Sequence, residues 1–77
     1  MKRKEKGFDY MMSFAPLWDT LERKNITTYK LIKEYNLSRG MLDKLKHDRN
    51  VTLETVDWLC TVLDCKVEDV VEYRKNE

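Results

Sequence analysis

Residues 27–45 of this 77-residue chain constrain its fold more than any other segment. They predict two short helices separated by a tight turn, because each helix has its own start signal. Thr27 and Ser38 stand where a side-chain hydroxyl accepts a backbone N–H from the first turn of a helix. Asn36 stands where the chain must reverse, and Asn tolerates the left-handed conformation better than any residue except Gly. The segment therefore predicts a pair of helices that pack closely together.

The first helix of this pair covers about residues 28–35, and the second, about residues 39–46, has two different faces. Leu42 and Leu45 anchor the second helix from one side, and Leu37 fills the corner before it. The outer side carries the remaining side chains, Arg39, Gly40, Met41, Asp43 and Lys44. A second helix that is held by its inner face and offers its N-terminal residues to base edges is the layout of a helix-turn-helix.

Patterns outside this pair predict three further helices. Pro16 suits the first position of a helix that runs to about Lys24, because its missing N–H would be unpaired there. This helix buries three side chains, Leu17, Trp18 and Leu21. Thr52 caps a helix that ends at Asp64. Its apolar stripe consists of Leu53, Val56, Leu59, Cys60 and Leu63. Lys66 is a poor cap for a final short helix, which holds Val67, Val70 and Val71.

Alternating apolar residues near the N-terminus predict a strand. After a basic tail, the period-two pattern comprises Phe8, Tyr10, Met12 and Phe14. A lone strand needs a partner, and residues 70–73 at the other end of the chain are the best one, since Val71 and Tyr73 share a face there. We predict a short two-stranded ladder that joins the two ends, within or between subunits.

The spacing over about residues 17–71 resembles the Cro and lambda-repressor type of DNA-binding regulators, the xenobiotic-response-element family. The positions that carry the resemblance are Leu31, Ile32, Asn36, Ser38, Leu42 and Leu45, together with the closing segment 52–71. Ile32 stands where the family usually has Ala, and Asn36 where it usually has Gly. The resemblance implies an all-α, five-helix domain of the lambda-repressor type, which we place over residues 14–77. The residue pattern adds the short terminal ladder and, over residues 1–13, a basic tail and possible strand.

The charges are separated along the chain although the net charge is only +1. Residues 23–50 carry eight Lys and Arg against three acids, whereas residues 51–77 carry three against seven. The positive block coincides with the predicted helix pair. It is either a random cluster of solvated charges or a surface that attracts a polyanion, and the coincidence favours the second interpretation.

Four residues of the second helix are predicted to face base edges, Arg39, Gly40, Asp43 and Lys44. Arg39 is the best candidate for bidentate contact with a guanine, the alternative being a phosphate contact or a solvated side chain. Lys44 reads a guanine or touches a phosphate. Gly40 either allows close approach of the backbone or reflects drift. Asp43 accepts from cytosine or, as we favour, pairs with Arg39 or Lys46 at helical spacing.

Phosphate contacts are predicted at helix starts and in the loop after the second helix. They comprise Thr27, Thr28, Ser38, Lys46, Arg49, Asn50 and Thr52. The family resemblance supports Thr27 and Thr28 at one phosphate and the loop cluster at another, the alternative being side chains that are only solvated. The basic tail, Lys2, Arg3, Lys4 and Lys6, either follows a groove or, as we favour, only solubilises the chain.

Trp58 lies off the apolar stripe of its helix, where family members usually carry a polar residue. It either anchors a homodimer interface together with Val62 and Tyr73, or folds over the terminal strands within one subunit. A two-fold dimer would supply the second reading helix that sequence-specific binding usually needs.

Several classes of function find no support in the sequence. It holds no Ser-His-Asp set, metal-ligand cluster or phosphate-cradling Gly loop, so we expect neither an enzyme nor a metal or other cofactor. No apolar run is long enough for a membrane span, which predicts a cytoplasmic protein. Cys60 and Cys65 lack redox or metal spacing, and a disulfide between them is improbable in a reducing cytosol. The leading hypothesis is a double-stranded DNA-binding transcriptional regulator, most simply a repressor. The alternative is a protein-interaction module with the same fold.

Overall fold

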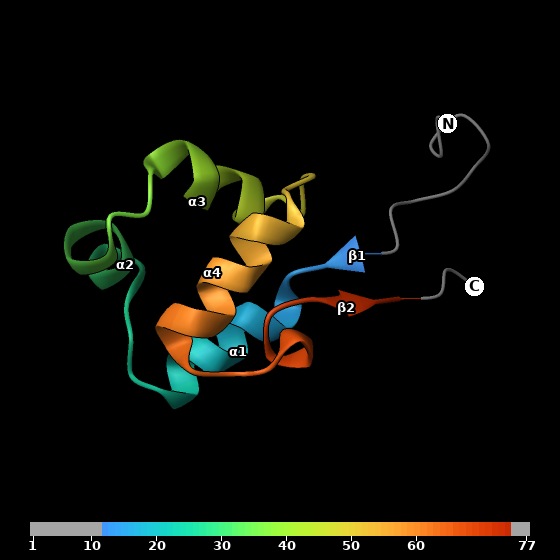
Figure 1. Ribbon diagram of the computed structural model, residues 1–77, viewed down its shortest axis with the longest axis horizontal. Helices are drawn as coiled ribbons and strands as arrows, with labels where there is room; N and C mark the ends of the chain where they lie inside the picture. Colours follow the sequence, from blue (N-terminus) through green and yellow to red (C-terminus); the bar gives the residue numbers. More distant parts are fainter. Residues whose placement is uncertain (1–11, 75–77) are drawn as a thin grey trace.

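The computed structural model describes residues 12–74, which form four α-helices, one 3₁₀-helix and two short strands (Figure 1). In chain order these elements are β1 (Met12–Ser13), α1 (Ala15–Arg23), α2 (Thr28–Tyr35), α3 (Arg39–Lys46), α4 (Leu53–Leu63), η2 (Val67–Asp69) and β2 (Glu72–Tyr73). The predicted all-α fold with a terminal ladder is confirmed, the fifth helical element being a single 3₁₀ turn. Phe8, Tyr10 and the basic tail lie outside the described residues.

The bounds of the helix pair follow from local capping bonds. The hydroxyl of Thr27 accepts the N–H of Lys30 at 3.0 Å, and that of Ser38 accepts the N–H of Met41 at 3.0 Å. Asn36 is left-handed, with φ 63° and ψ 31°, so it ends α2 as predicted. Thr27 thus sets the start of α2, Asn36 sets its end, and Ser38 sets the start of α3.

The core is built from one fully buried leucine of each α-helix. Leu17 of α1, Leu31 of α2, Leu45 of α3 and Leu59 of α4 are each 0% exposed. Each contributes roughly 1.5–3 kcal/mol relative to an exposed position. Val70, after η2, is equally buried and closes the core from the C-terminal side. The apolar stripes read from the sequence therefore converge on one centre.

The stripe of α4 begins later than predicted. Leu53 is 84% exposed, whereas Val56, Leu59 and Leu63 are buried. Leu53 is the first residue of α4, directly after the Thr52 cap, so its side chain lies beyond the end of the core. Its inclusion in the stripe was wrong.

Asp69 supplies the cap that Lys66 lacks. Its carboxylate accepts the backbone N–H of Lys66 at 3.1 Å, and its backbone carbonyl accepts the hydroxyl of Thr20 at 2.7 Å. Arg23 completes the cluster by donating to the Thr20 hydroxyl at 3.0 Å. Thr20 is fully buried, so these bonds satisfy a polar group inside the core and fasten η2 to α1.

The two ends of the described chain form the predicted antiparallel ladder. Met12 pairs with Tyr73 and Ser13 with Glu72. Ser13 is buried, whereas Met12 is 44% and Tyr73 66% exposed. Residues opposite each other in a ladder point to the same face, so the outer face of this ladder is apolar. No helix within residues 12–74 is long and apolar enough to cross a membrane.

Candidate nucleic-acid interface

Helix α3 is held by its inner face and open on its outer face. Leu45 is 0% and Leu42 8% exposed, whereas Arg39, Gly40, Asp43, Lys44 and Lys46 are all exposed. In Figure 1, α3 crosses one end of the molecule, with α4 beneath it. The four residues predicted to face bases thus share an outward-facing helix whose position is fixed by buried leucines.

Gly40 leaves free space at the start of α3. A Cβ atom built on it would meet no atom within 4 Å. The domain itself therefore does not require a glycine there, although Gly inside a helix costs roughly 0.5–1 kcal/mol relative to Ala. The glycine leaves the backbone of α3 without a side chain next to Arg39.

Asp43 contacts a different partner from the one predicted. Its carboxylate lies 3.3 Å from Nδ1 of His47, which also lies 2.9 Å from the backbone carbonyl of Asp43. The favoured pairing with Arg39 or Lys46 was wrong: the carboxylate of Asp43 lies beside His47, four residues further along the chain. Within residues 12–74, Arg39 and Lys46 make no ion pair.

The end of α3 brings two predicted DNA contacts together. Asp48 is left-handed, with φ 54°, and the N–H of Arg49 donates to the carbonyl of Lys44 at 2.8 Å. This is the 6→1 bond of a Schellman motif, and it holds the backbone of Arg49 against that of Lys44. Lys44 and Arg49 are both exposed, and neither forms an ion pair within the described part of the chain. The sequence spacing alone did not indicate this pairing.

Asp48 also fastens this loop to a segment that is distant in the sequence. Its Oδ1 atom accepts the backbone N–H of Phe14 at 2.8 Å. The bond joins the loop after α3 to the start of α1, 34 residues away in sequence. Arg49 and Asn50, both exposed, are therefore carried by an anchored loop.

The remaining predicted phosphate contacts lie at helix starts. The hydroxyls of Thr27, Ser38 and Thr52 each accept a backbone N–H as an N-cap, which leaves the O–H groups of Thr27 and Ser38 available as donors. The Thr52 hydroxyl also lies 3.3 Å from that of Thr55. Thr28 is the first residue of α2 and is half-buried. Three helix starts with hydroxyl caps are suited to phosphate oxygens because unpaired N–H groups gather there.

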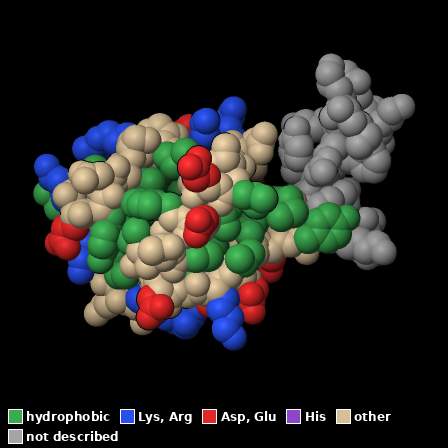
Figure 2. All heavy atoms as spheres, viewed as in Figure 1, with side chains coloured by type: hydrophobic (Ala, Val, Ile, Leu, Met, Phe, Trp, Pro, Cys, Tyr) green, Lys and Arg blue, Asp and Glu red, His purple; other side chains and the backbone are tan. Residues whose placement is uncertain are grey.

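Positive side chains lie along the edge of the molecule at α3. Figure 2 shows Lys and Arg along the edge over α3, whereas the face toward the viewer is mainly hydrophobic with a few acidic side chains. Lys and Arg occur on the opposite edge as well, so in this view the positive side chains are not confined to the surface over α3.

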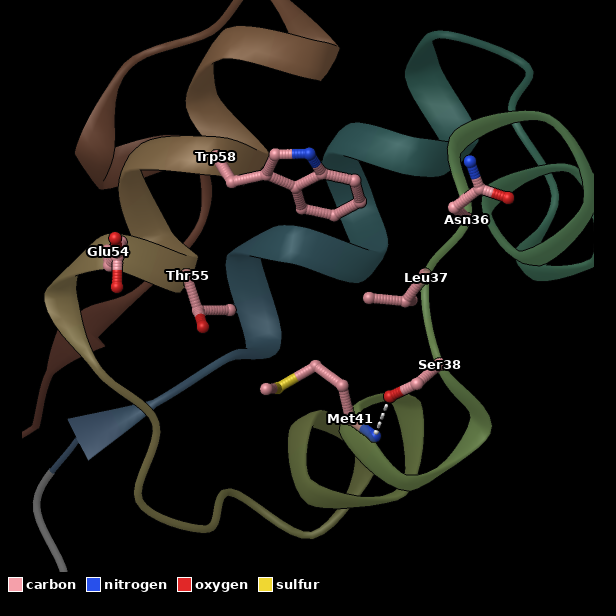
Figure 3. Close-up of a pocket in the computed structure, with 7 residues that line it drawn as sticks. All are labelled: Asn36, Leu37, Ser38, Met41, Glu54, Thr55 and Trp58. Carbon is pink, nitrogen blue, oxygen red and sulfur yellow. Dashed lines mark hydrogen bonds between the residues drawn. The ribbon is translucent and has the colours of Figure 1, made fainter.

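A hollow of about 350 Å³ lies between α4 and the turn before α3 (Figure 3). Its floor is apolar, with Leu37, Met41 and the indole of Trp58 directed into it. Trp58 thus lies against the helix-turn-helix turn and does not fold over the terminal strands. Met41 faces the hollow, so it is not on the outer face of α3 with Arg39.

The three residues assigned to a dimer interface do not lie together in this hollow. Trp58 lines it, Val62 is half-buried one turn further along α4, and Tyr73 is exposed in β2. Tyr73 has an exposed apolar neighbour of its own in Met12, its partner across the ladder. The structure thus offers two separate apolar surfaces.

The comparisons with known proteins agree with this geometry. Residues 16–76 match the sequence model of the Cro/C1-type helix-turn-helix DNA-binding domain, and the chain belongs to this family. The transcriptional regulator VanUg, known from a crystal structure, has a similar fold, with a TM-score of 0.77 and 24% identity over 86% of this chain and 88% of that one. No curated protein sequence matches the chain. The resemblance to Cro and lambda-repressor proteins is confirmed.

Proposed function

We propose that this protein is a sequence-specific transcriptional regulator, acting as a repressor in the cytoplasm, that reads the major groove of double-stranded DNA with α3. The observation that carries the proposal is the outer face of α3, which presents Arg39, Gly40 and Lys44 while Leu42 and Leu45 are buried. First-turn side chains of such a helix reach base edges. Family membership and the fold of VanUg support the same class of function.

In this proposal the residues have two kinds of role. Arg39 donates to a guanine, with Gly40, Asp43 and Lys44 beside it along the groove. The phosphate contacts come from Thr27, Thr28, Ser38, Lys46, Arg49, Asn50 and Thr52. They fix the register without reading sequence. Lys44, whose carbonyl accepts the N–H of Arg49 at the end of α3, contacts either a base or a phosphate in this proposal.

The protein acts as a homodimer in this proposal, and the outer face of the terminal ladder forms the interface. Met12 and Tyr73 are its exposed apolar pair. Sedimentation of the Tyr73→Ser variant should show a weakened dimer, and Trp58→Ala should leave it intact. The opposite result would move the interface to the flank of α4 that carries Trp58 and Val62.

The division into a tail over residues 1–13 and a domain over 14–77 remains a proposal.

Selection of bound fragments from a random duplex library tests the main proposal. A two-fold symmetric motif with half-sites about one helical turn apart would support it. Affinity for the selected site should fall about 10³-fold between 50 and 200 mM salt if a dimer contacts about six phosphates. No enrichment, or affinity that does not respond to salt, would contradict it.

The alternative is a protein-interaction module, and the hollow at Trp58 is the observation that favours it. A partly open apolar hollow with a Trp is typical of a protein-contact surface. If this hypothesis is correct, Trp58→Ala abolishes partner binding while Arg39→Ala has no effect. The DNA hypothesis predicts the opposite for duplex binding: Arg39→Ala weakens it, and Trp58→Ala leaves it unchanged.

A further inference from the structure

The C-terminal end of α4 places two cysteines at paired positions. Asp64 is left-handed, with φ 53° and ψ 60°, and its N–H donates to the carbonyl of Thr61 at 3.4 Å. The N–H of Cys65 donates to the carbonyl of Cys60 at 3.0 Å. These are the two hydrogen bonds of a Schellman motif, with Cys60 and Cys65 at the positions whose side chains contact each other.

The end of α1 shows what these positions hold when they only stabilise the fold. Asn25 is left-handed there, with φ 62°, and the N–H of Ile26 donates to the carbonyl of Leu21 at 2.9 Å. Leu21 is buried and Ile26 packs against the core. An apolar pair is the ordinary occupant of the motif, so two thiols at the end of α4 add a chemistry that the fold does not need.

Both thiols are free and half-buried, so small reagents reach them while they pack against the core. Burial raises the pKa of the Cys65 thiol above its usual value, and the adjacent Cys60 raises this pKa further. Influence of one thiol on the other agrees with the side-by-side placement that the backbone indicates. Cys65 is therefore suited to act second, after Cys60 has reacted.

We propose that Cys60 and Cys65 form a redox modification site, although their spacing in the sequence is not that of a redox motif and a reducing cytosol disfavours their disulfide. The pair closes reversibly to an intrachain disulfide when a small disulfide such as glutathione disulfide accumulates. The thiolate of Cys60 attacks one sulfur of glutathione disulfide and releases a glutathione thiolate. The thiolate of Cys65 then attacks the Cys60 sulfur of this mixed disulfide and releases the second glutathione. Two protein thiols are oxidised, one glutathione disulfide is reduced to two glutathione molecules, and these take up both protons.

The position of the pair predicts what the disulfide does. The C-terminal end of α4 lies beside α1 and η2, at the opposite end of α4 from α3 (Figure 1). A bond there restrains the unfolded chain without covering the outer face of α3. We expect oxidation to raise the midpoint of thermal unfolding by several degrees. DNA affinity should change by less than about twofold, because phosphate and base contacts remain in place.

The test incubates the full chain in glutathione buffers of graded redox potential, followed by thiol alkylation and intact-mass measurement. The expected product is a monomer about 2 Da lighter than the reduced protein, with both cysteines protected from alkylation. Cys60→Ser and Cys65→Ser should instead stop at the glutathione mixed disulfide. Accumulation of that adduct in the unaltered chain, disulfide-linked dimers, or two alkylated cysteines at the most oxidising potential would each overturn the proposal.

A matched pair of variants tests the geometry. Asp64→Gly keeps the left-handed conformation, whereas Asp64→Val disfavours it. Disulfide formation in Asp64→Val should need a ratio of glutathione disulfide to glutathione about fivefold higher or more. Asp64→Gly should form its disulfide at nearly the same ratio as the unaltered chain. Circular dichroism identifies the folded samples. Equal behaviour of two folded variants would show that the backbone motif does not set the pairing. None of these measurements involves DNA, so their failure is independent of the proposed function.

Discussion

The ends of α3 and α4 have the same backbone and different side chains. Asp48 and Asp64 are left-handed at φ 54° and 53°. A 6→1 bond follows each of them, at 2.8 Å after α3 and 3.0 Å after α4. The paired positions hold Lys44 and Arg49 at the end of α3, and two cysteines at the end of α4. The fold requires only the left-handed residue, so the paired positions are free to carry different chemistry.

The two aspartates differ in one further respect. Asp48 accepts the N–H of Phe14 through its side chain, whereas Asp64 makes no such long-range bond within the described residues. One aspartate therefore joins two parts of the domain, and the other only ends a helix. This difference gives the largest effect that we expect from a single substitution at either end.

Asp48→Val should destabilise the domain by about 2–4 kcal/mol, because it strains the left-handed backbone and leaves the Phe14 N–H unpaired. Asp64→Val should cost about 1–2 kcal/mol through the backbone alone. Urea unfolding gives both free energies. Asp48→Gly separates the two causes, because it removes the bond to Phe14 and keeps the conformation. Equal losses in the two Val variants would show that the bond to Phe14 contributes nothing.

The same comparison shows how far the sequence predicts the fold. Thr27, Asn36 and Ser38 act on neighbours within a few residues, so the bounds of α2 and α3 are predictable from local chemistry. The bond between Asp48 and Phe14 is not, because it depends on how α1 meets the loop after α3. The prediction that Leu53 belongs to the buried stripe fails for a related reason, because helical spacing does not show where the core ends along a helix.

The sequence predicts which residues form the candidate site, but not how they are arranged in space. The exposure of Arg39 and the burial of Leu42 follow from helical spacing, and the structure shows both. The pairing of Asp43 with His47 was missed because several partners at similar spacing compete on an exposed helix. The placement of Trp58 against the turn before α3 depends on the crossing of α4 with the helix pair, which no local pattern contains.

The paired positions should also differ in their effect on DNA binding. Arg49→Ala should weaken binding to all sequences by about tenfold and reduce the salt slope by about one, since it removes a phosphate contact. Cys65→Ser, the matched position at the end of α4, should leave affinity unchanged. Arg39→Ala should instead relax the preference at one base pair, by about 1–3 kcal/mol of discrimination. Binding to the selected duplex and its single-base variants measures all three.

Identical profiles for Arg39→Ala and Arg49→Ala would contradict the division between base reading and phosphate contact. Weaker DNA binding in Cys65→Ser would instead extend the DNA-binding surface to the end of α4. The first outcome concerns α3 and the second the end of α4, so the three variants are best measured in one experiment.

Gly40→Ala gives the smallest effect and the sharpest contrast between stability and function. An added methyl group meets no atom within 4 Å, so the helix propensity of Ala should raise the free energy of unfolding by about 0.5–1 kcal/mol. If DNA approaches the backbone at the start of α3, the same methyl group should weaken duplex binding severalfold. Thr61→Ala, on the exposed face of α4, is an uncharged control for a helix substitution outside the proposed contacts. A variant that is more stable and binds DNA unchanged would mean that no base or phosphate approaches Gly40, and Arg39 would then read the groove from a greater distance.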